Sequence, residues 1–200
     1  MEQTPNRAAA WIAPSAELYG EIHLGEGVSI WPRVVMRAEA QSIRIGRFTN
    51  VQDFVMVHIG FDQPTRIGDY CSITHHATVH GATIEDECLI GINATLMDGV
   101  VIGAGSIVAG HTIVTEGTVV PPGSVVAGVP GKVIASRDNR LANRLNAVAY
   151  HQNAIAYAAG NHRRWAEPEF QSLMARARAE GLAEEAISGA KSRSGSGSDS

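Results

Sequence analysis

Aliphatic residues recur at intervals of six along most of the chain. Starting from Ile67, this interval leads to Ile73 and Val79, and after one step of five the series resumes at Ile84. The series then continues through Ile90, Leu96, Ile102, Val108, Val114 and Val120. An earlier part of the chain has the same spacing at Ile12, Leu18, Leu24, Ile30 and Met36, and again at Ile45, Val51 and Val57. An amphipathic α-helix would need apolar residues three and four positions apart, so this spacing does not predict helices.

A second position in each hexapeptide is restricted to small or β-branched residues. It lies two residues before the aliphatic position and is occupied by Val28, Thr49, Val55, Cys71, Ala77, Cys88, Ala94, Val100, Ser106, Thr112 and Thr118. One large and one small inward residue per hexapeptide predict a narrow parallel β-helix, in which stacked coils of three hexapeptides bury a continuous aliphatic column. Both cysteines occupy the small position, and we assign them no disulfide and no chemistry. We therefore predict an all-β, single-stranded parallel β-helix over residues 11–134.

The interval of six ends near residue 138, and the sequence that follows has helical character. Apolar residues at helical spacing precede Gly160, a residue type that commonly ends helices. Residues 167–186 predict a second helix. We expect residues 138–186 to form a C-terminal helical extension that packs along the β-helix. Residues 187–200 have low complexity, which predicts a disordered tail.

The composition argues against two kinds of partner. The formal net charge is −4 and the chain has no basic run, which argues against binding of nucleic acid. No apolar stretch approaches the roughly 18 residues of a membrane span, so we expect no membrane partner. The N-terminal sequence lacks the apolar core of a signal peptide and the chain has two cysteines, so we expect a cytoplasmic protein.

Histidine, the commonest metal ligand among side chains, is concentrated in one part of the chain: four of the eight histidines lie between positions 58 and 80. His58 follows inward Val57, and His80 follows inward Val79. They are 22 residues apart, and removing an insertion of four, within "GFDQPT", leaves 18, the length of one coil. The register therefore predicts that both side chains point outward from the same face in adjacent coils, where they could share one metal ion.

His75 lies two residues after inward Ile73, and the register places it across a corner of the triangular coil. In a cyclic trimer the corner of one subunit can face the flat side of the next. Ligands from two chains would then complete a three-histidine site, which leaves zinc an open fourth position for water. In an alternative interpretation, outward histidines merely pack and hydrogen-bond at an interface. We expect the other histidines to be structural (His76), in a turn (His111) or solvated (His23, His151 and His162).

Several stretches together resemble the gamma-class carbonic anhydrases: "SIWPRVVMRAEAQSIRIGRFTNVQD", "VMVHIG", "SITHHATVHG" and "GVPGKVI". The resemblance covers residues 11–134. It implies a homotrimer of left-handed β-helices with a divalent ion, Zn²⁺ or alternatively Fe²⁺ or Co²⁺, at each subunit interface. The ligands that it implies are His58, His75 and His80, the same three that the register brings forward.

The resemblance also implies the roles of further residues. Asn50 and Gln52 match the amides that hold the bound water and substrate. Arg37 and Asp53 match an ion pair across the interface, and Glu39 takes the place of a family aspartate. The implied activity is that of a carbonic-anhydrase-like lyase, in which a metal-bound hydroxide attacks carbon dioxide to form bicarbonate.

The sequence departs from the family pattern in places that bear on activity. The family's Arg-Gly-Asp is Arg37-Ala38-Glu39 here, and the "GFDQPT" loop lacks the acidic residues that shuttle protons in active members, apart from Asp62. We therefore expect slow turnover or none. Two other functions stay open: an acyltransferase or thioesterase acting on coenzyme A thioesters, and a non-catalytic trimeric binding protein in which the metal is a structural staple.

Overall fold

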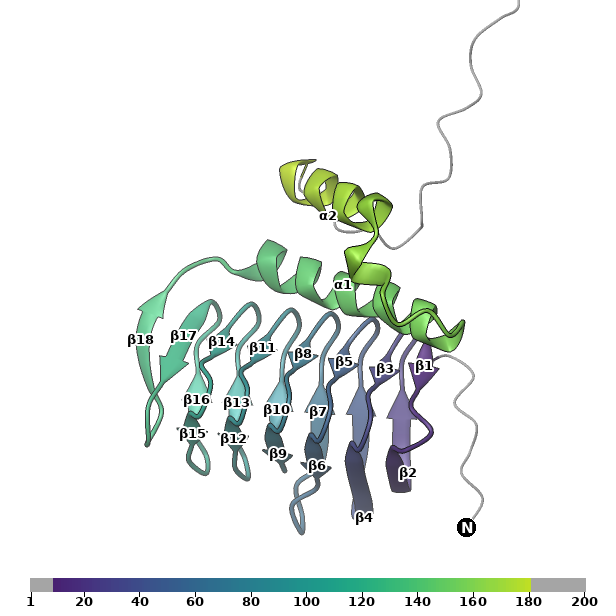
Figure 1. Ribbon diagram of the computed structural model, residues 1–200. Helices are drawn as coiled ribbons and strands as arrows, with labels where there is room; N and C mark the ends of the chain where they lie inside the picture. Colours follow the sequence, from purple (N-terminus) through teal and green to yellow (C-terminus); the bar gives the residue numbers. More distant parts are fainter. Residues whose placement is uncertain (1–8, 181–200) are drawn as a thin grey trace, which may run out of the picture.

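The structure is a computed structural model that describes residues 9–180, and these form a β-helix followed by helices (Figure 1). The prediction of a left-handed parallel β-helix with C-terminal helices is confirmed. The strands are β1 (Trp11–Ile12), β2 (Glu17–Leu24), β3 (Ser29–Ile30), β4 (Val35–Ile45), β5 (Asn50–Val51), β6 (Met56–His58), β7 (Thr65–Ile67), β8 (Ser72–Ile73), β9 (Thr78–His80), β10 (Thr83–Ile84), β11 (Leu89–Ile90), β12 (Thr95–Leu96), β13 (Val101–Ile102), β14 (Ile107–Val108), β15 (Ile113–Val114), β16 (Val119–Val120), β17 (Ser124–Ala127) and β18 (Lys132–Ser136).

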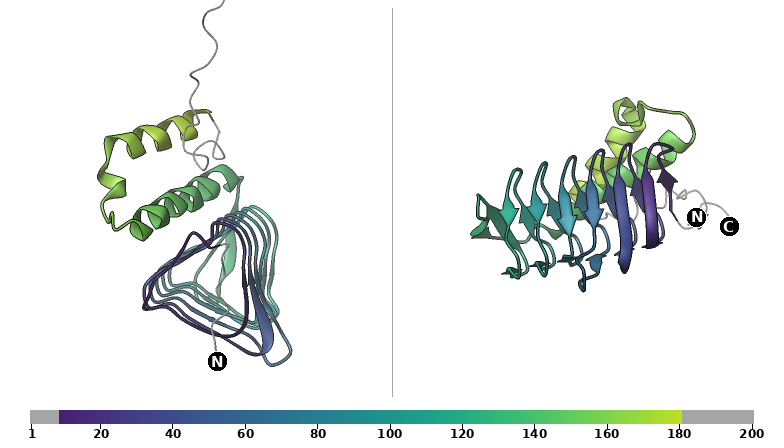
Figure 2. Two further views of the ribbon diagram at one scale, coloured as in Figure 1. Left: turned by 90° about the vertical axis from the view of Figure 1, so that its right-hand side faces the viewer. Right: turned by 90° about the horizontal axis from the view of Figure 1, so that it is seen from below.

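The strands make three flat faces, and the cross-section is a triangle (Figure 2, left). Face 1 contains β1, β3, β5, β8, β11, β14 and β17 in spatial order, with β18 added antiparallel at its end. Face 2 contains the first part of β4 followed by β6, β9, β12 and β15. Face 3 contains the second part of β4 followed by β7, β10, β13 and β16. Because β2 and β4 bend around a corner, they belong to both faces 2 and 3.

The aliphatic column forms the core of the β-helix. Ile30, Met36, Ile73, Leu96 and Ile102 are all fully buried, as the interval of six predicted. The small position is filled as expected, since Cys71 and Cys88 are free thiols buried inside the coil. Burial, followed by the contact with Cys88, raises the pKa of the Cys71 thiol well above its usual range.

Corners between the faces use the left-handed backbone conformation. In the described part of the chain, eight residues other than glycine have φ between 54° and 61°: Arg33, Phe48, Phe54, Tyr70, His76, Glu87, Asn93 and His111. At His76 this conformation separates the ring from its neighbour His75. The His76 ring instead stacks on Phe54, with the ring centroids 4.9 Å apart. Adjacent histidines at this corner therefore have different surroundings.

The chain returns along the β-helix as α1 (Arg140–Ala158), η1 (Arg164–Ala166) and α2 (Pro168–Glu180). Helix α1 lies along face 1 and contacts β1, β3, β5 and β8 (Figures 1 and 2). Helix α2 packs against α1, and η1 was not predicted from the sequence. The predicted tail over residues 187–200 lies outside the described residues. No helix within residues 9–180 is long and apolar enough to cross a membrane.

Polar contacts join α1 to the corners beside face 1. Asn143 is buried, and its Nδ2 donates to the carbonyl oxygen of Glu87 at 2.7 Å. The guanidinium of Arg144 lies 2.7 Å from the Glu87 carboxylate. His151 is also buried and its Nδ1 lies 3.1 Å from the carbonyl oxygen of Gly27. The expectation that His151 is solvated was therefore wrong, because the docked helix removes its ring from water.

Candidate metal centre

The pairing of β6 with β9 places His58 directly opposite His80 on face 2. The ring centroids are 4.9 Å apart, and His58 Nδ1 lies 3.0 Å from His80 Nε2. The adjacency predicted from the 22-residue separation is confirmed. Parallel pairing in register is the reason, because it stacks equivalent positions of successive coils on one another.

Carboxylates flank the two histidines, one at each end. Glu39 Oε2 lies 3.0 Å from His58 Nε2, and Asp98 Oδ1 lies 2.6 Å from His80 Nδ1. Glu39 also pairs with Arg37. Partial desolvation raises the pKa of Glu39, but a backbone hydrogen bond, His58 and Arg37 outweigh it, and the net effect lowers the pKa. A row of four groups, Glu39–His58–His80–Asp98, thus runs across face 2.

With one choice of tautomers, the row leaves two nitrogen lone pairs facing each other. A neutral imidazole has one N–H group. Where Glu39 and Asp98 each accept that hydrogen, His58 Nδ1 and His80 Nε2 both present lone pairs to the same small space. Two lone pairs 3.0 Å apart repel unless a cation or a proton lies between them. This arrangement fits a divalent metal ion.

The spacing and the flanking carboxylates agree with that interpretation. Two nitrogen ligands about 2.05 Å from a tetrahedral zinc ion lie about 3.3 Å apart, close to the separation observed. Metal-bound histidines usually donate their second N–H group to a carboxylate or carbonyl, which fixes the ring and its tautomer. Glu39 and Asp98 occupy the positions required for that role.

Asp98 was not identified from the sequence. The pairing of β9 with β12 places Leu96 opposite Val79, so Met97 is the residue opposite His80, and Asp98 follows it in the turn. Two glycines make room for its carboxylate. A Cβ atom at Gly81 would lie 2.2 Å from Asp98 Oδ1, and one at Gly60 would lie 2.8 Å from it. Gly81 also has φ of +55°, so any other residue there would be strained.

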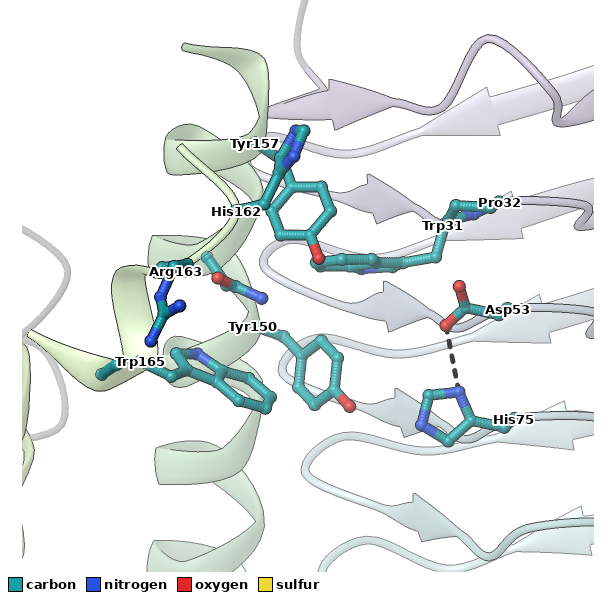
Figure 3. A pocket seen from close by; sticks show the side chains of 11 residues that line it. Trp31, Pro32, Asp53, His75, Tyr150, Tyr157, His162, Arg163 and Trp165 are labelled. Carbon is teal, nitrogen blue, oxygen red and sulfur yellow. Dashed lines mark hydrogen bonds and ion pairs between the residues drawn. The ribbon is translucent and has the colours of Figure 1, made fainter. Parts of the chain in front are cut away.

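His75 lies at the corner between faces 1 and 2, away from the row. Its Nδ1 lies 3.0 Å from Asp53 Oδ2, and its other ring nitrogen points toward Tyr150 (Figure 3). Within residues 9–180 no three histidine, cysteine or acidic side chains are arranged to hold a metal ion. A three-histidine site built on His58 and His80 would therefore take its third ligand from outside the described part of this chain, and His75 of a neighbouring chain in that role stays a prediction.

Asn50 and Gln52 are buried on face 1 and at its corner. Gln52 Nε2 donates to Asn50 Oδ1 at 2.9 Å, and Asn50 Nδ2 donates to Ser72 Oγ at 2.9 Å. Asn146 of α1 also donates to Ser72 Oγ at 2.9 Å. These amides lie on the His75 side of the molecule, and one chain does not bring them to His58 and His80.

Arg37 and Asp53 do not meet within one chain either. Arg37 contacts Glu39 on face 2, whereas Asp53 contacts His75 at the corner. Arg37 is therefore on the same face as His58, and Asp53 is beside His75. A pair between them stays a prediction for two neighbouring chains.

Comparison with known proteins supports the fold first. Residues 81–116 match the bacterial transferase hexapeptide family, described as six repeats. A hexapeptide transferase family protein from Anaplasma phagocytophilum has 30% sequence identity and a TM-score of 0.67, with 77% of this chain and 89% of that chain aligned. The fold and its repeat thus define the class of hexapeptide-repeat β-helix proteins.

Sequence relatives assign the chain to a narrower group within the hexapeptide-repeat proteins. A probable carbonic anhydrase from Methanocaldococcus jannaschii is 42% identical over 123 residues, which cover 62% of this chain and 77% of the relative. Gamma carbonic anhydrase 1, mitochondrial, from Arabidopsis thaliana is 39% identical over 131 residues, 62% of this chain and 48% of the relative. The carnitine operon protein CaiE from Escherichia coli K12 is 34% identical over 139 residues, 68% of this chain and 71% of the relative.

The chain belongs to the gamma carbonic anhydrase family of hexapeptide-repeat proteins. Gamma carbonic anhydrases are metalloenzymes. The match spans about half the length of the plant relatives.

Proposed function

We propose that this protein is a gamma-class carbonic anhydrase that interconverts carbon dioxide and bicarbonate at metal sites between the subunits of a homotrimer. Each site would use His58 and His80 of one subunit and His75 of the next, with Zn²⁺ as the metal or Fe²⁺ or Co²⁺ in its place. The observation that carries the proposal is the arrangement of the two imidazole rings. One nitrogen of each ring faces the other ring at 3.0 Å, and the second nitrogen of each ring contacts Glu39 or Asp98.

The surface near the candidate ligands supports contact with another subunit. Phe54 and Ile92 lie at the same corner as His75, with 51% and 48% of their surface exposed, and Ile113 of face 2 is 37% exposed. Large apolar residues gathered near one corner and one face favour contact with a second copy of the chain. The contact would bring His75 of one subunit to the row on the next.

Residues of this chain supply positioning and proton acceptance. When bound, a divalent metal lowers the pKa of its water ligand to about 7 and polarises substrate oxygens. Glu39 and Asp98 orient the two imidazoles by accepting their N–H groups. The amides of Asn50 and Gln52, on the His75 side, would orient water and substrate after assembly.

Proton export limits the expected rate. Glu39 is half exposed, with 50% of its side-chain surface accessible, and so can pass a proton to solvent. Its lowered pKa makes it a weak base, because a carboxylate that ionises more readily accepts protons less readily. The exposed Asp62 is the acidic residue of the adjacent loop. We therefore expect carbon dioxide hydration well below the diffusion limit.

Metal content and molecular mass, measured together, test the proposal. The wild-type protein is expected to be a trimer with about one divalent ion per chain. His75→Ala should remove the metal, whereas His76→Ala, which changes the neighbouring exposed histidine, should retain it. A metal-free wild-type trimer, or full metal content in His75→Ala, would refute the three-ligand assignment. A carbon dioxide hydration assay on the loaded protein then separates a catalyst from a metal-stapled binding protein.

Acyl transfer is the second candidate, favoured by similarity to the hexapeptide transferase family protein. Such chemistry needs one histidine as a general base rather than a metal-binding pair. Calorimetric titration with coenzyme A tests this candidate. Saturable binding by the metal-free protein would favour it over carbon dioxide hydration.

A further inference from the structure

A cavity of about 500 Å³ lies between the His75 corner of the β-helix and the C-terminal helical segment (Figure 3). Pockets of this size hold small organic ligands, whereas carbon dioxide needs far less room. The cavity contains neither His58 nor His80. It is therefore a site separate from the row on face 2.

Four aromatic rings line the cavity. Trp31 comes from the β-helix, Tyr150 and Tyr157 come from α1, and Trp165 comes from η1. The rings are fixed by contact with one another, since the Trp31 centroid lies 4.9 Å from Tyr157 and 5.4 Å from Tyr150. Tyr150 in turn lies 5.2 Å from Trp165. A planar ring entering this space would meet aromatic surfaces already held in position.

Polar groups of the helical side are hydrogen-bond donors. Asn153 lines the cavity and only 8% of its surface is exposed, yet its amide makes no hydrogen bond to any residue within 9–180. Arg163 lines the same cavity, and its guanidinium forms no ion pair with a described residue. The Asn153 amide can donate to an anionic ligand, and a cation without a described counterion favours one.

The other lining groups include one carboxylate, which repels a nearby anion, so the charge of the ligand must lie on the helical side, away from it. Asp53 is the acidic residue among those lining the cavity, and it already accepts a hydrogen bond from His75. Burial first, and then Asp53 and Tyr157, raise the pKa of Tyr150 to about 12, so its hydroxyl remains a donor at neutral pH. Figure 3 shows Arg163 and Trp165 on the helical side, with Asp53 and His75 on the opposite side.

We propose that this cavity binds a small aromatic carboxylate, with its ring against Trp31 and Tyr150 and its carboxylate on Arg163 and Asn153. The site uses one chain and no metal. Because His75 and Asp53 line it, the cavity borders the proposed carbonic anhydrase centre. Binding measured on metal-free protein tests the cavity alone, so either proposal can fail without the other.

Calorimetry on the full chain in the presence of a chelator tests the site with three matched probes. Benzoate carries both the ring and the charge, cyclohexanecarboxylate keeps the charge without the aromatic ring, and benzylamine keeps the ring with the opposite charge. We expect benzoate to bind with Kd of about 1 mM or tighter. The other two probes should bind at least about fivefold more weakly.

Variants identify where the probe binds. Arg163→Gln and Asn153→Leu should each weaken benzoate binding by roughly tenfold, because each removes a donor to the carboxylate. Arg66→Gln, at an exposed position of β7 outside the cavity, is the matched control and should bind as the wild type does. Arg163 is exposed, so its replacement decides the result even where Asn153→Leu does not fold.

Three results would overturn the proposal. The first is the absence of saturable benzoate binding up to about 20 mM. The second is tighter binding of benzylamine than of benzoate, which would assign a cationic ligand to Asp53. The third is wild-type affinity in Arg163→Gln, which would place the carboxylate elsewhere.

Discussion

Faces 1 and 2 of the β-helix come from the same six-residue repeat but have different surroundings. Face 1 is covered by α1, and its outward Ser72 is buried and accepts a hydrogen bond from Asn146 of that helix. Within residues 9–180 no helix packs on face 2, and His58 and Glu39 keep 20% and 50% of their side-chain surface exposed. The same repeat can therefore build a face that is buried under a helix and a face whose side chains remain accessible. The difference comes from what packs against each face.

The largest expected effect concerns the covered face. Trp31 is buried against Trp11, Tyr150 and Tyr157. Trp31→Ala should lower the free energy of unfolding by about 3–5 kcal/mol, because it removes the contact that joins the β-helix to α1. Phe61→Ala, at a residue that is 91% exposed, should change it by less than about 0.5 kcal/mol. Denaturant unfolding measures both, and equal effects would show that α1 contributes little to stability.

Substitutions on face 2 should change the affinity for metal rather than the free energy of unfolding. Asp98→Ala should weaken metal binding by about 10–100-fold, because His80 loses the carboxylate that orients it. Asp98→Asn should lose less, since its amide oxygen still accepts from Nδ1. Competition with a chelator measures the affinity, with Glu116→Gln at an exposed turn as the control. Wild-type affinity in Asp98→Ala would remove Asp98 from the site.

Gly81→Ala tests the position of the Asp98 carboxylate without changing Asp98 itself. The new Cβ would lie 2.2 Å from Asp98 Oδ1, at a backbone φ of +55°. We expect a loss of metal affinity in the same direction as for Asp98→Ala, with an added loss of melting temperature from backbone strain. Unchanged affinity would show that the carboxylate can move without releasing His80.

Acidification should have a smaller effect on stability, through the buried His151 of α1. Burial lowers the pKa of His151, although the Gly27 carbonyl partly opposes this. The unfolded chain takes up a proton near the ordinary pKa of about 6.5, whereas the folded chain does not until a lower pH. The melting temperature should therefore fall as the pH drops from 7 toward 5, and it should fall less in His151→Phe. His111→Gln, at an exposed corner, should keep the wild-type slope, and an equal slope in all three proteins would contradict this account.

The smallest effect on the single chain is expected at Arg37. Its pair with Glu39 is exposed, so Arg37→Ala should change the free energy of unfolding of the chain by less than about 1 kcal/mol. The predicted pair with Asp53 across an interface would make the same substitution weaken the trimer. Sedimentation at decreasing protein concentration measures this, and undisturbed assembly would argue against the interfacial pair.

The repeat made the fold and part of the site predictable. Because side chains in a β-helix follow the six-residue interval, the inward column and the pairing of His58 with His80 could be worked out by counting. The same count does not reach Asp98, because the step of five between Val79 and Ile84 shortens the next coil and places Met97 opposite His80. The cavity beside His75 could not be predicted, since its walls come from Trp31 and from Tyr150, far apart in sequence.

The sequence by itself determined the β-helix, the inward positions of Cys71 and Cys88, and the pairing of outward His58 with His80 on face 2, because periodic local geometry decides all three. Only the tertiary structure decided that α1 lies along face 1, that His151 is buried, and that Asn153 and Arg163 meet the aromatic cavity. These features depend on contacts between segments with no common period. The packing of helix on coil therefore had to be seen in three dimensions.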